Sequence, residues 1–148
     1  MSPETTIPVI RLARAADAER IVDLVRQLAI SGDASAITAG FVRLALERPE
    51  MTLYVAERSG RVLGVMSLSE RASLCHAASS CTIEELVVDE GARGQGIGSA
   101  LVLRAIEHAR ARGSAELSVS TMPDNAAALR LYRRHGLTDE AVLLERHL

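Results

Sequence analysis

A glycine-rich hexapeptide lies between a strand-like run and a helix-like run, and this order constrains the fold more than any other feature of the chain. Residues 93–98 read R-G-Q-G-I-G, residues 83–88 before them are mostly apolar, and residues 99–103 after them are typical of a helix. Backbone N–H groups in the first turn of a helix have no intrahelical partner and lie at the positive end of the helix dipole. Glycine lets such a loop turn tightly and lets a phosphate approach the backbone. The sequence therefore predicts a strand, an anion-binding loop and a helix in succession.

Two common phosphate-binding loops fit this segment poorly. A P-loop needs a lysine followed by Ser or Thr, whereas all 17 Lys and Arg residues of this chain are arginines. A dinucleotide-binding fingerprint needs a glycine at position 99 and an acidic residue about 20 residues further on. Position 99 is Ser, and the candidate acid Glu116 opens the next strand instead of ending it. The loop therefore belongs to another class of anion site.

The remaining pattern predicts an α/β protein with helices on both faces of a sheet. Asp17 is the expected cap of the first helix, Gly32 is its expected end, and Ser59-Gly60 is the expected turn of a hairpin. Gly113 and Gly136 are expected to end the last two helices. The strands are expected at 8–13, 52–58, 61–68, 82–88, 116–120 and 140–147, and the helices at 17–31, 35–47, 99–112 and 123–135.

Composition narrows the class of protein. A length of 148 residues and a hydrophobic fraction of 48% favour one packed domain, residues 1–148. The first residues lack the basic and apolar parts of a secretory signal, so we expect a cytoplasmic protein in which Cys75 and Cys81 are free thiols. The apolar runs are too short to cross a membrane. A net charge of −2 gives no basic field for nucleic acid or an anionic membrane, which favours a small substrate or a single amine on a larger one.

Two motifs in the right order carry a resemblance to a known family. Arg93, Gly96 and Gly98 match the Q/R-x-x-G-x-G/A pattern of motif A of the GNAT superfamily, the Gcn5-related N-acetyltransferases. Residues 125–137 resemble its motif B, a helix that begins with Asn and ends in Tyr, three residues, Gly and an apolar residue. The resemblance implies the GNAT fold, a mixed sheet of about six to seven strands flanked by about four helices in the order βααβββαβαβ. It also implies acetyl-CoA as cosubstrate and, by family habit, a homodimer.

The resemblance assigns a role to the segment around the glycine loop. In the family, the pantetheine arm of acetyl-CoA pairs with the strand before the loop, and here the N–H of Val88 is the candidate contact for the thioester oxygen. The expected strand residues are Leu86, Val87 and Val88, and the expected pyrophosphate contacts are Arg93, Gly94, Gln95, Gly96, Ile97, Gly98 and Ser99. Asn125 is equally suited to capping its helix and to binding the pantetheine.

Tyr132 and Glu84 are the candidate catalytic residues. Tyr132 lies where the family keeps the tyrosine that protonates the coenzyme A thiolate; the alternative is a half-buried helix tyrosine. Because neighbouring side chains of a regular strand point to opposite faces, only one of Glu84 and Glu85 is expected to face the cleft, although a bulge would exchange them. Glu84 matches the glutamate base of the spermidine/spermine branch, acting through water, and Glu85 is then a substrate contact or a solvated side chain. In the alternative, both are surface carboxylates and ordered water takes the proton.

The implied function is acetyl-CoA-dependent transfer of an acetyl group to a primary amine of a small molecule or peptide. The amine would attack the thioester directly in a ternary complex, so Cys75 would not be a nucleophile. The alternative is a non-catalytic acyl-CoA-binding sensor. No metal is expected, because Cys75, His76 and Cys81 make a weak zinc pattern. The loop 71–80 and the helix 35–47 are expected to flank the acceptor. His108, His135 and His147 are expected to be surface residues of helices or strands and are given no role.

Overall fold

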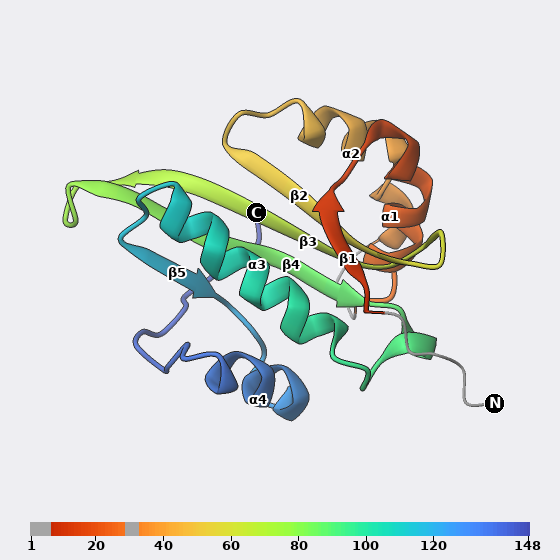
Figure 1. Cartoon of the computed structure of the whole chain (residues 1–148). Helices are drawn as coiled ribbons and strands as arrows, with labels where there is room; N and C mark the ends of the chain where they lie inside the picture. Colours follow the sequence, from red (N-terminus) through yellow and green to blue (C-terminus); the bar gives the residue numbers. More distant parts are fainter. Residues whose placement is uncertain (1–6, 29–32) are drawn as a thin grey trace.

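Five strands form one sheet in which neighbours along the chain are also neighbours in space. The computed structural model describes residues 7–28 and 33–148. The strands, β1 to β5, are Val9–Leu12, Met51–Arg58, Arg61–Ser73, Ala78–Val88 and Glu116–Val119. The helices, α1 to α4, are Ala18–Val25, Ala39–Leu46, Ile97–Ala111 and Ala126–Arg134. Strands β1 to β4 pair antiparallel, and β5 adds to β4 in parallel. Figure 1 shows α3, which connects β4 to β5 along the chain, lying across one face of this sheet.

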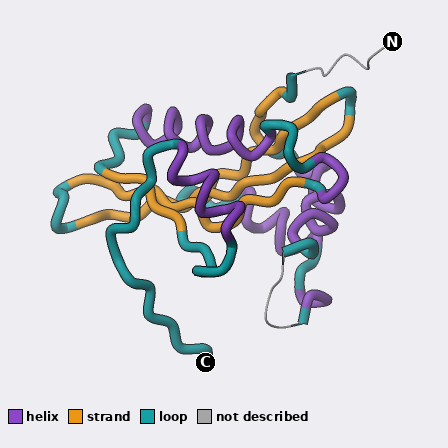
Figure 2. The backbone as a smooth tube through the Cα atoms, turned by 90° about the horizontal axis from the view of Figure 1, so that it is seen from below, coloured by secondary structure: helices purple, strands orange, loops and turns teal. Residues whose placement is uncertain are grey.

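The two faces of the sheet are covered by different helices. Helices α1 and α2 pack on one face with Val55, Val65 and Val87, and α3 and α4 pack on the other face with Met66 and Leu68. Figure 2 shows α3 along one side of the strands and α1 and α2 on the other side. The alternation of strand side chains therefore divides the core into two layers, called here the α1/α2 face and the α3/α4 face.

Local signals place several boundaries as predicted. Ser59 and Gly60 have φ values of 52° and 75°, which a two-residue hairpin turn requires. Gly113 and Gly136 follow their helices with φ values of 70° and 86°. At the start of α4, the Asn125 Oδ1 accepts a hydrogen bond of 3.1 Å from the N–H of Ala128. These turn and cap predictions are confirmed.

Asp17 stands at the N-cap position of α1 as predicted, but its side chain does not act as the cap. Asp17 accepts no capping hydrogen bond from α1; its carboxylate instead binds the guanidinium of Arg11 at 2.8 and 3.0 Å and the N–H of Arg14 at 2.7 Å. A charged partner from β1 competes successfully with the helix end, because charge-assisted hydrogen bonds are the stronger ones. The expected length of this helix is wrong, because α1 ends at Val25, well before Gly32, which itself lies outside the described residues.

The expected helix over 35–47 is two elements. Ala34–Ala36 forms a short 3₁₀ turn, and Ile37 and Thr38 are extended before α2 begins at Ala39. The Thr38 Oγ1 accepts a hydrogen bond of 3.2 Å from the N–H of Phe41, which fixes that start. A threonine with this capping geometry ends the preceding segment as it begins the next one.

The strand expected at 140–147 is absent from the described residues, so their sheet has five strands instead of six to seven. Residues 138–148 contain neither helix nor strand, and Val142, Leu143 and Leu144 are 84%, 61% and 89% exposed. Figure 2 shows this segment running away from the strands. An apolar run becomes a strand only through pairing and packing against neighbours, and this run has neither.

The segment 71–80, expected as a loop, is mostly strand. Strand β3 continues to Ser73 and β4 begins at Ala78, so only residues 74–77 form the tip of a long hairpin. Figure 1 shows this hairpin extending beyond the rest of the sheet. The sequence there is polar and has weak strand propensity, so the pairing of the two strands decides its structure.

Gly64 in β3 lets α3 lie close to the sheet. A Cβ there would be 3.2 Å from Ile97 Cγ2, from Leu101 Cδ1 and from the Val87 carbonyl oxygen. We expect Gly64→Val to lower the free energy of unfolding by about 1–3 kcal/mol, the usual cost of overpacking. Unfolding in urea would measure this change in the free energy of unfolding. Gly91→Val is the control, because nothing lies within 4 Å of a Cβ at Gly91. Equal midpoints for the two variants would contradict the prediction.

Candidate functional site

The last part of strand β4 extends beyond the end of its neighbour β5, which leaves one edge of β4 open. Strand β5 pairs only with Ser80–Ile83 of β4, whereas β4 continues to Val88. The N–H of Asp89 donates to the Leu63 carbonyl at 2.8 Å, so the peptide groups of Asp89 face β3. Because these groups alternate along an antiparallel pair, those of Val87 also face β3, and those of Leu86 and Val88 face the open edge. A ligand that carries amides can pair with such an edge.

The glycine loop follows this open edge directly. A 3₁₀ turn over Glu90–Ala92 leads to Gly94 and Gly96, whose φ values are 74° and 82°. Helix α3 then begins at Ile97 without a side-chain cap. The N–H groups of its first turn have no intrahelical partner, which is the geometry that binds a phosphate. Strand, loop and helix therefore follow one another as the sequence predicts.

Side chains of the loop are held in place by neighbouring groups. The Arg93 Nε donates to the Val88 carbonyl at 3.1 Å, and the Gln95 Oε1 accepts from Arg58 Nη2 at 2.6 Å. Arg58 was not identified from the sequence. The sequence could have indicated Arg58 through its place at the end of β2, beside the turn at Ser59-Gly60. The antiparallel pairing of β2, β3 and β4 brings this turn beside the end of β4. Arg58 therefore adds a guanidinium to the rim of the glycine loop.

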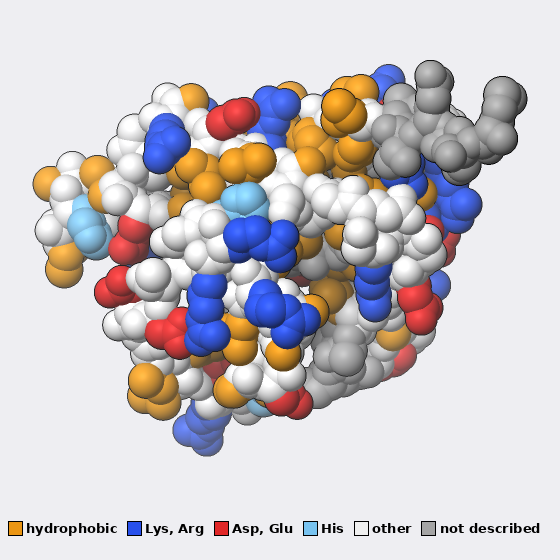
Figure 3. All heavy atoms as spheres, turned by 60° about the horizontal axis from the view of Figure 1, so that its bottom comes forward, with side chains coloured by type: hydrophobic (Ala, Val, Ile, Leu, Met, Phe, Trp, Pro, Cys, Tyr) orange, Lys and Arg blue, Asp and Glu red, His pale blue; other side chains and the backbone are white. Residues whose placement is uncertain are grey.

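Helix α4 packs against the first turn of α3. A Cβ at Gly98 would lie 3.2 Å from Leu131 Cδ2, so glycine permits this close contact. The Nε2 of His135 lies 3.0 Å from the Ser99 Oγ. Figure 3 shows arginine side chains gathered on the face that carries these two helices, and α4 contributes Arg130, Arg133 and Arg134. The glycine loop is thus bordered by α4.

Tyr132 of α4 is 9% exposed and belongs to the core on the α3/α4 face. Burial raises the pKa of its phenol, so the hydroxyl is protonated at neutral pH. Within residues 7–28 and 33–148, this hydroxyl has no hydrogen-bond partner, and no fully buried side-chain oxygen lacks one. The Tyr132 oxygen therefore reaches open space, while its ring is packed.

Glu84 and Glu85 both lie on the α1/α2 face. In the pairing of β3 with β4, Ser67 is opposite Glu85 and Leu68 is opposite Ile83, so Glu84 is the extra residue of a β-bulge. The hydroxyl of Ser67 donates to the Glu85 carboxylate, and the hydroxyl of Ser69 donates to the Glu84 carboxylate. Because Ser67 and Ser69 are two residues apart on one strand, they share a face, and so do the two carboxylates.

The expectation that only one carboxylate faces the cleft is therefore wrong. A bulge adds a residue and interrupts the alternation, which a sequence pattern alone does not reveal. Among the described residues, no arginine or histidine lies within ion-pair distance of either carboxylate. Two unpaired negative charges thus lie side by side at the open end of β4.

Comparison with known proteins identifies the family. The model of the Acetyltransferase (GNAT) family matches residues 15–137. The chain belongs to the GNAT family. It is therefore an acyltransferase of the acetyl-CoA-dependent N-acetyltransferase class.

Individual relatives agree with this assignment. The chain is 35% identical over 136 residues to an aminoalkylphosphonate N-acetyltransferase of Salmonella typhimurium, covering 90% of this chain and 88% of that protein. It is 33% identical over 105 residues to an aminoglycoside N(6')-acetyltransferase type 1 of Klebsiella aerogenes, covering 70% and 69%. Among solved structures, a transcriptional regulator from Bacillus halodurans C-125 is similar with a TM-score of 0.85 and 27% identity, covering 95% of this chain and 99% of that one.

In this GNAT acetyltransferase, the cysteines have no common site. Cys75 is exposed at the hairpin tip, Cys81 is buried in β4, and both are free thiols. Burial raises the pKa of Cys81 to about 11, which leaves its thiol protonated and unreactive at neutral pH. No group of three His, Cys, Asp or Glu residues is placed to hold a metal ion in the described part of the chain. No helix there is long and apolar enough to span a membrane.

Two histidines of the GNAT chain that were expected to be surface residues contact distant segments of the chain. His135 contacts Ser99 at the start of α3. The His108 side chain is only 8% exposed and is hydrogen-bonded on both ring nitrogens, to Tyr54 and to Glu70. Helical periodicity does not reveal either contact, since the partners come from distant parts of the sequence.

Proposed function

We propose that acetyl-CoA binds along the open edge of β4 and that an acetyl group passes directly to a primary amine in a ternary complex. The observation that carries the proposal is the loss of the β5 partner after Ile83, directly before the glycine loop. Backbone groups of Leu86 and Val88 would pair with the pantetheine amides. The first-turn N–H groups of α3 and the guanidinium groups of Arg93 and Arg58 would bind the pyrophosphate.

The proposed proton donor and base belong to opposite faces of the sheet. Tyr132 lies on the α3/α4 face, and Glu84 lies on the α1/α2 face, with the end of β4 between them. In this mechanism, Glu84 accepts the proton of the attacking amine through water, and the N–H of Val88 stabilises charge on the thioester oxygen. The Tyr132 phenol gives its proton to the departing thiolate.

The acceptor would approach from the α1/α2 face and carry positive charge. Glu84 and Glu85 offer two carboxylates with serine partners and no cation, which favours an ammonium group on the acceptor. The names of two relatives, an aminoalkylphosphonate and an aminoglycoside N-acetyltransferase, support an amine on a small molecule. We therefore propose a small cationic amine or a peptide amine as acceptor, with Glu85 as a contact for its charge.

The rival function is a non-catalytic acyl-CoA-binding sensor. Such a protein would need the glycine loop and the edge of β4 but neither a proton donor nor a base. A protonated phenol at the cleft and two unpaired carboxylates on the acceptor side favour catalysis. Release of coenzyme A in the presence of an amine separates the two functions.

Thermal unfolding with acetyl-CoA tests the proposal. At about 100 times its Kd, a ligand that binds only the folded protein adds about 2.7 kcal/mol, which raises the Tm of a domain of this size by about 5–10 °C. Acetyl-pantetheine, which lacks the pyrophosphate, is expected to give a smaller rise. Next, a panel of amines would be incubated with acetyl-CoA and the protein, and the free thiol of released coenzyme A would be measured. No rise with acetyl-CoA would contradict the proposed site, and a rise without thiol release from any amine would favour the sensor.

A further inference from the structure

A second groove lies on the other flank of α3, between this helix and strands β1 and β2. It has a volume of about 530 Å³, within the range of small-molecule pockets. Its lining residues are Leu12, Thr52, Tyr54, Arg104, Glu107, His108, Ala111 and Arg112. None of them belongs to the glycine loop or to β4, so the groove is separate from the proposed acetyl-CoA cleft.

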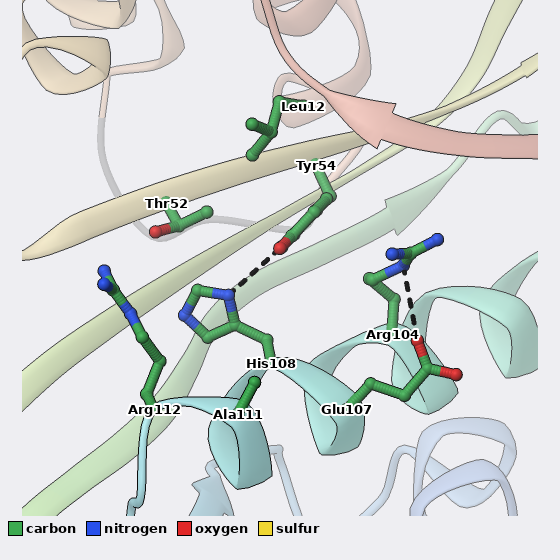
Figure 4. A pocket seen from close by; sticks show the side chains of 8 residues that line it. All are labelled: Leu12, Thr52, Tyr54, Arg104, Glu107, His108, Ala111 and Arg112. Carbon is green, nitrogen blue, oxygen red and sulfur yellow. Dashed lines mark hydrogen bonds and ion pairs between the residues drawn. The ribbon is translucent and has the colours of Figure 1, made fainter.

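A chain of three side chains from three elements forms one side of this groove. The Tyr54 hydroxyl lies 3.0 Å from the Nδ1 of His108, and the His108 Nε2 lies 2.6 Å from a carboxylate oxygen of Glu70. A carboxylate accepts, so Nε2 carries the proton and Nδ1 accepts from the Tyr54 hydroxyl. Figure 4 shows the tyrosine and histidine side chains pointing toward each other between β2 and α3. The Tyr54 oxygen keeps free lone pairs with which it can accept a further hydrogen bond.

Two arginines stand on either side of this chain. Arg104 lies four residues before His108 on α3, and Arg112, the residue that follows the helix, lies four residues after it, so all three lie on nearly the same side. Arg112 uses its Nε to bind Glu70 at 3.0 Å, and Figure 4 shows its guanidinium on the opposite side of His108 from Arg104. Arg104 lies over the Tyr54 ring at 5.7 Å. The terminal N–H groups of Arg112 make no hydrogen bond within the described ranges.

The groups of the groove that are free to make hydrogen bonds are mainly donors, the N–H groups of the two arginines. Apart from its contact with the Tyr54 ring, Arg104 makes only long polar contacts, 3.4 Å to the Ile10 carbonyl and 3.8 Å to Glu107. Glu70 is satisfied by His108 and Arg112, and Glu107 is exposed enough to turn away. Guanidinium groups bind the oxygens of carboxylates and phosphates through paired N–H donors. Leu12 and Ala111 add apolar surface beside them.

We propose that this groove is a second ligand site, which takes a small organic molecule with a carboxylate or phosphate group. The oxyanion binds the guanidinium of Arg104, Arg112 adds positive charge on the other side of His108 (Figure 4), and the apolar body packs against Leu12 and Ala111. A hydroxyl or amide N–H of the ligand donates to the Tyr54 oxygen. A network that only held α3 on the sheet would need Glu70, His108 and Tyr54, but it would not need the Arg104 guanidinium, whose polar contacts are all long, or the unbound terminal N–H groups of Arg112.

A residue-resolved titration of the full chain tests this site. Amide signals would be followed by nuclear magnetic resonance with benzoate as the carboxylate probe, phenyl phosphate as the phosphate probe and benzamide as the uncharged match. We expect saturable shifts at residues 104–112 and 52–54 with one or both anions and none with benzamide. Benzoate alone would assign a carboxylate ligand, and phenyl phosphate alone a phosphate ester. Shifts confined to residues 93–99, or no saturable shift at all, would overturn the proposal.

Charge variants of α3 provide the matched controls. Arg104→Gln is expected to raise the Kd of the bound anion at least about tenfold, the usual effect of losing a charge-assisted hydrogen bond. Glu107→Gln is expected to lower the Kd, because it removes a negative charge from the rim. Arg110 is on the same helix but does not line the groove, so Arg110→Gln is expected to leave the Kd unchanged. Equal losses for Arg104→Gln and Arg110→Gln would reveal unspecific attraction to a basic helix and contradict the site.

Discussion

Replacing Tyr132 with phenylalanine is expected to lower the turnover number at least about tenfold. A general acid typically contributes about 10²- to 10⁴-fold to the rate, so a tenfold loss is the smallest effect that agrees with this role. The physical reason lies in the environment of the phenol. Burial raises its pKa, so the group is protonated when the C–S bond breaks, and its oxygen reaches open space although the ring is packed. A phenyl ring keeps that packing and removes only the hydroxyl group that carries the proton. Steady-state rates with saturating acetyl-CoA and a reactive amine would measure the effect.

The same variant carries its own controls. The Tyr132 hydroxyl has no partner within the described residues, so its removal leaves no neighbour unsatisfied, and the Tm is expected to stay near that of the wild type. The Kd of acetyl-CoA is also expected to stay near normal, because the proposed contacts are backbone groups and arginines. An unchanged turnover number with normal binding would remove Tyr132 from the mechanism and restore the alternative of a half-buried helix tyrosine.

Features set by the local backbone were predictable from the sequence. The turn at Ser59-Gly60, the glycines after α3 and α4, and the asparagine at the start of α4 follow from conformations that few residues adopt. The glycine loop is the most informative case, because the strand before it, the positive φ values and the helix after it are all local. The family also follows from this loop together with the helix that Asn125 caps.

Features set by partners distant in sequence were not predictable. Glu84 faces the same side as Glu85 because Glu84 is the extra residue of a bulge and has no partner on β3. The Asp17 carboxylate does not cap α1 because it binds Arg11. Helical periodicity predicts His108 to be a surface residue, but in the fold its ring is hydrogen-bonded to Tyr54 and Glu70, which lie on strands of the sheet. The apolar run at 140–147 shows the converse, since strand propensity without a neighbouring strand gives no strand.

Replacing Glu84 with glutamine is expected to lower the rate at neutral pH by about 10²-fold and to displace the activity profile to higher pH. An amine attacks only in its neutral form, so an enzyme without a base depends on the amine losing its proton to the solvent. That loss becomes easier as the pH rises toward the pKa of the amine, and the remaining activity should therefore rise with it. Rates across the pH range with one small amine would measure the displacement.

Glu85→Gln is the matched comparison, because the bulge places the two carboxylates on one face and each has a serine partner. We expect this variant to raise the KM for a cationic amine and to leave the shape of the pH profile unchanged, since a substrate contact does not take the proton. If Glu85→Gln displaces the profile and Glu84→Gln does not, the roles are reversed. If neither variant changes the profile or the KM, both are surface carboxylates and ordered water takes the proton. The unpaired charges at the end of β4 would then serve neither catalysis nor recognition, and the acceptor would have to be sought among uncharged or anionic amines.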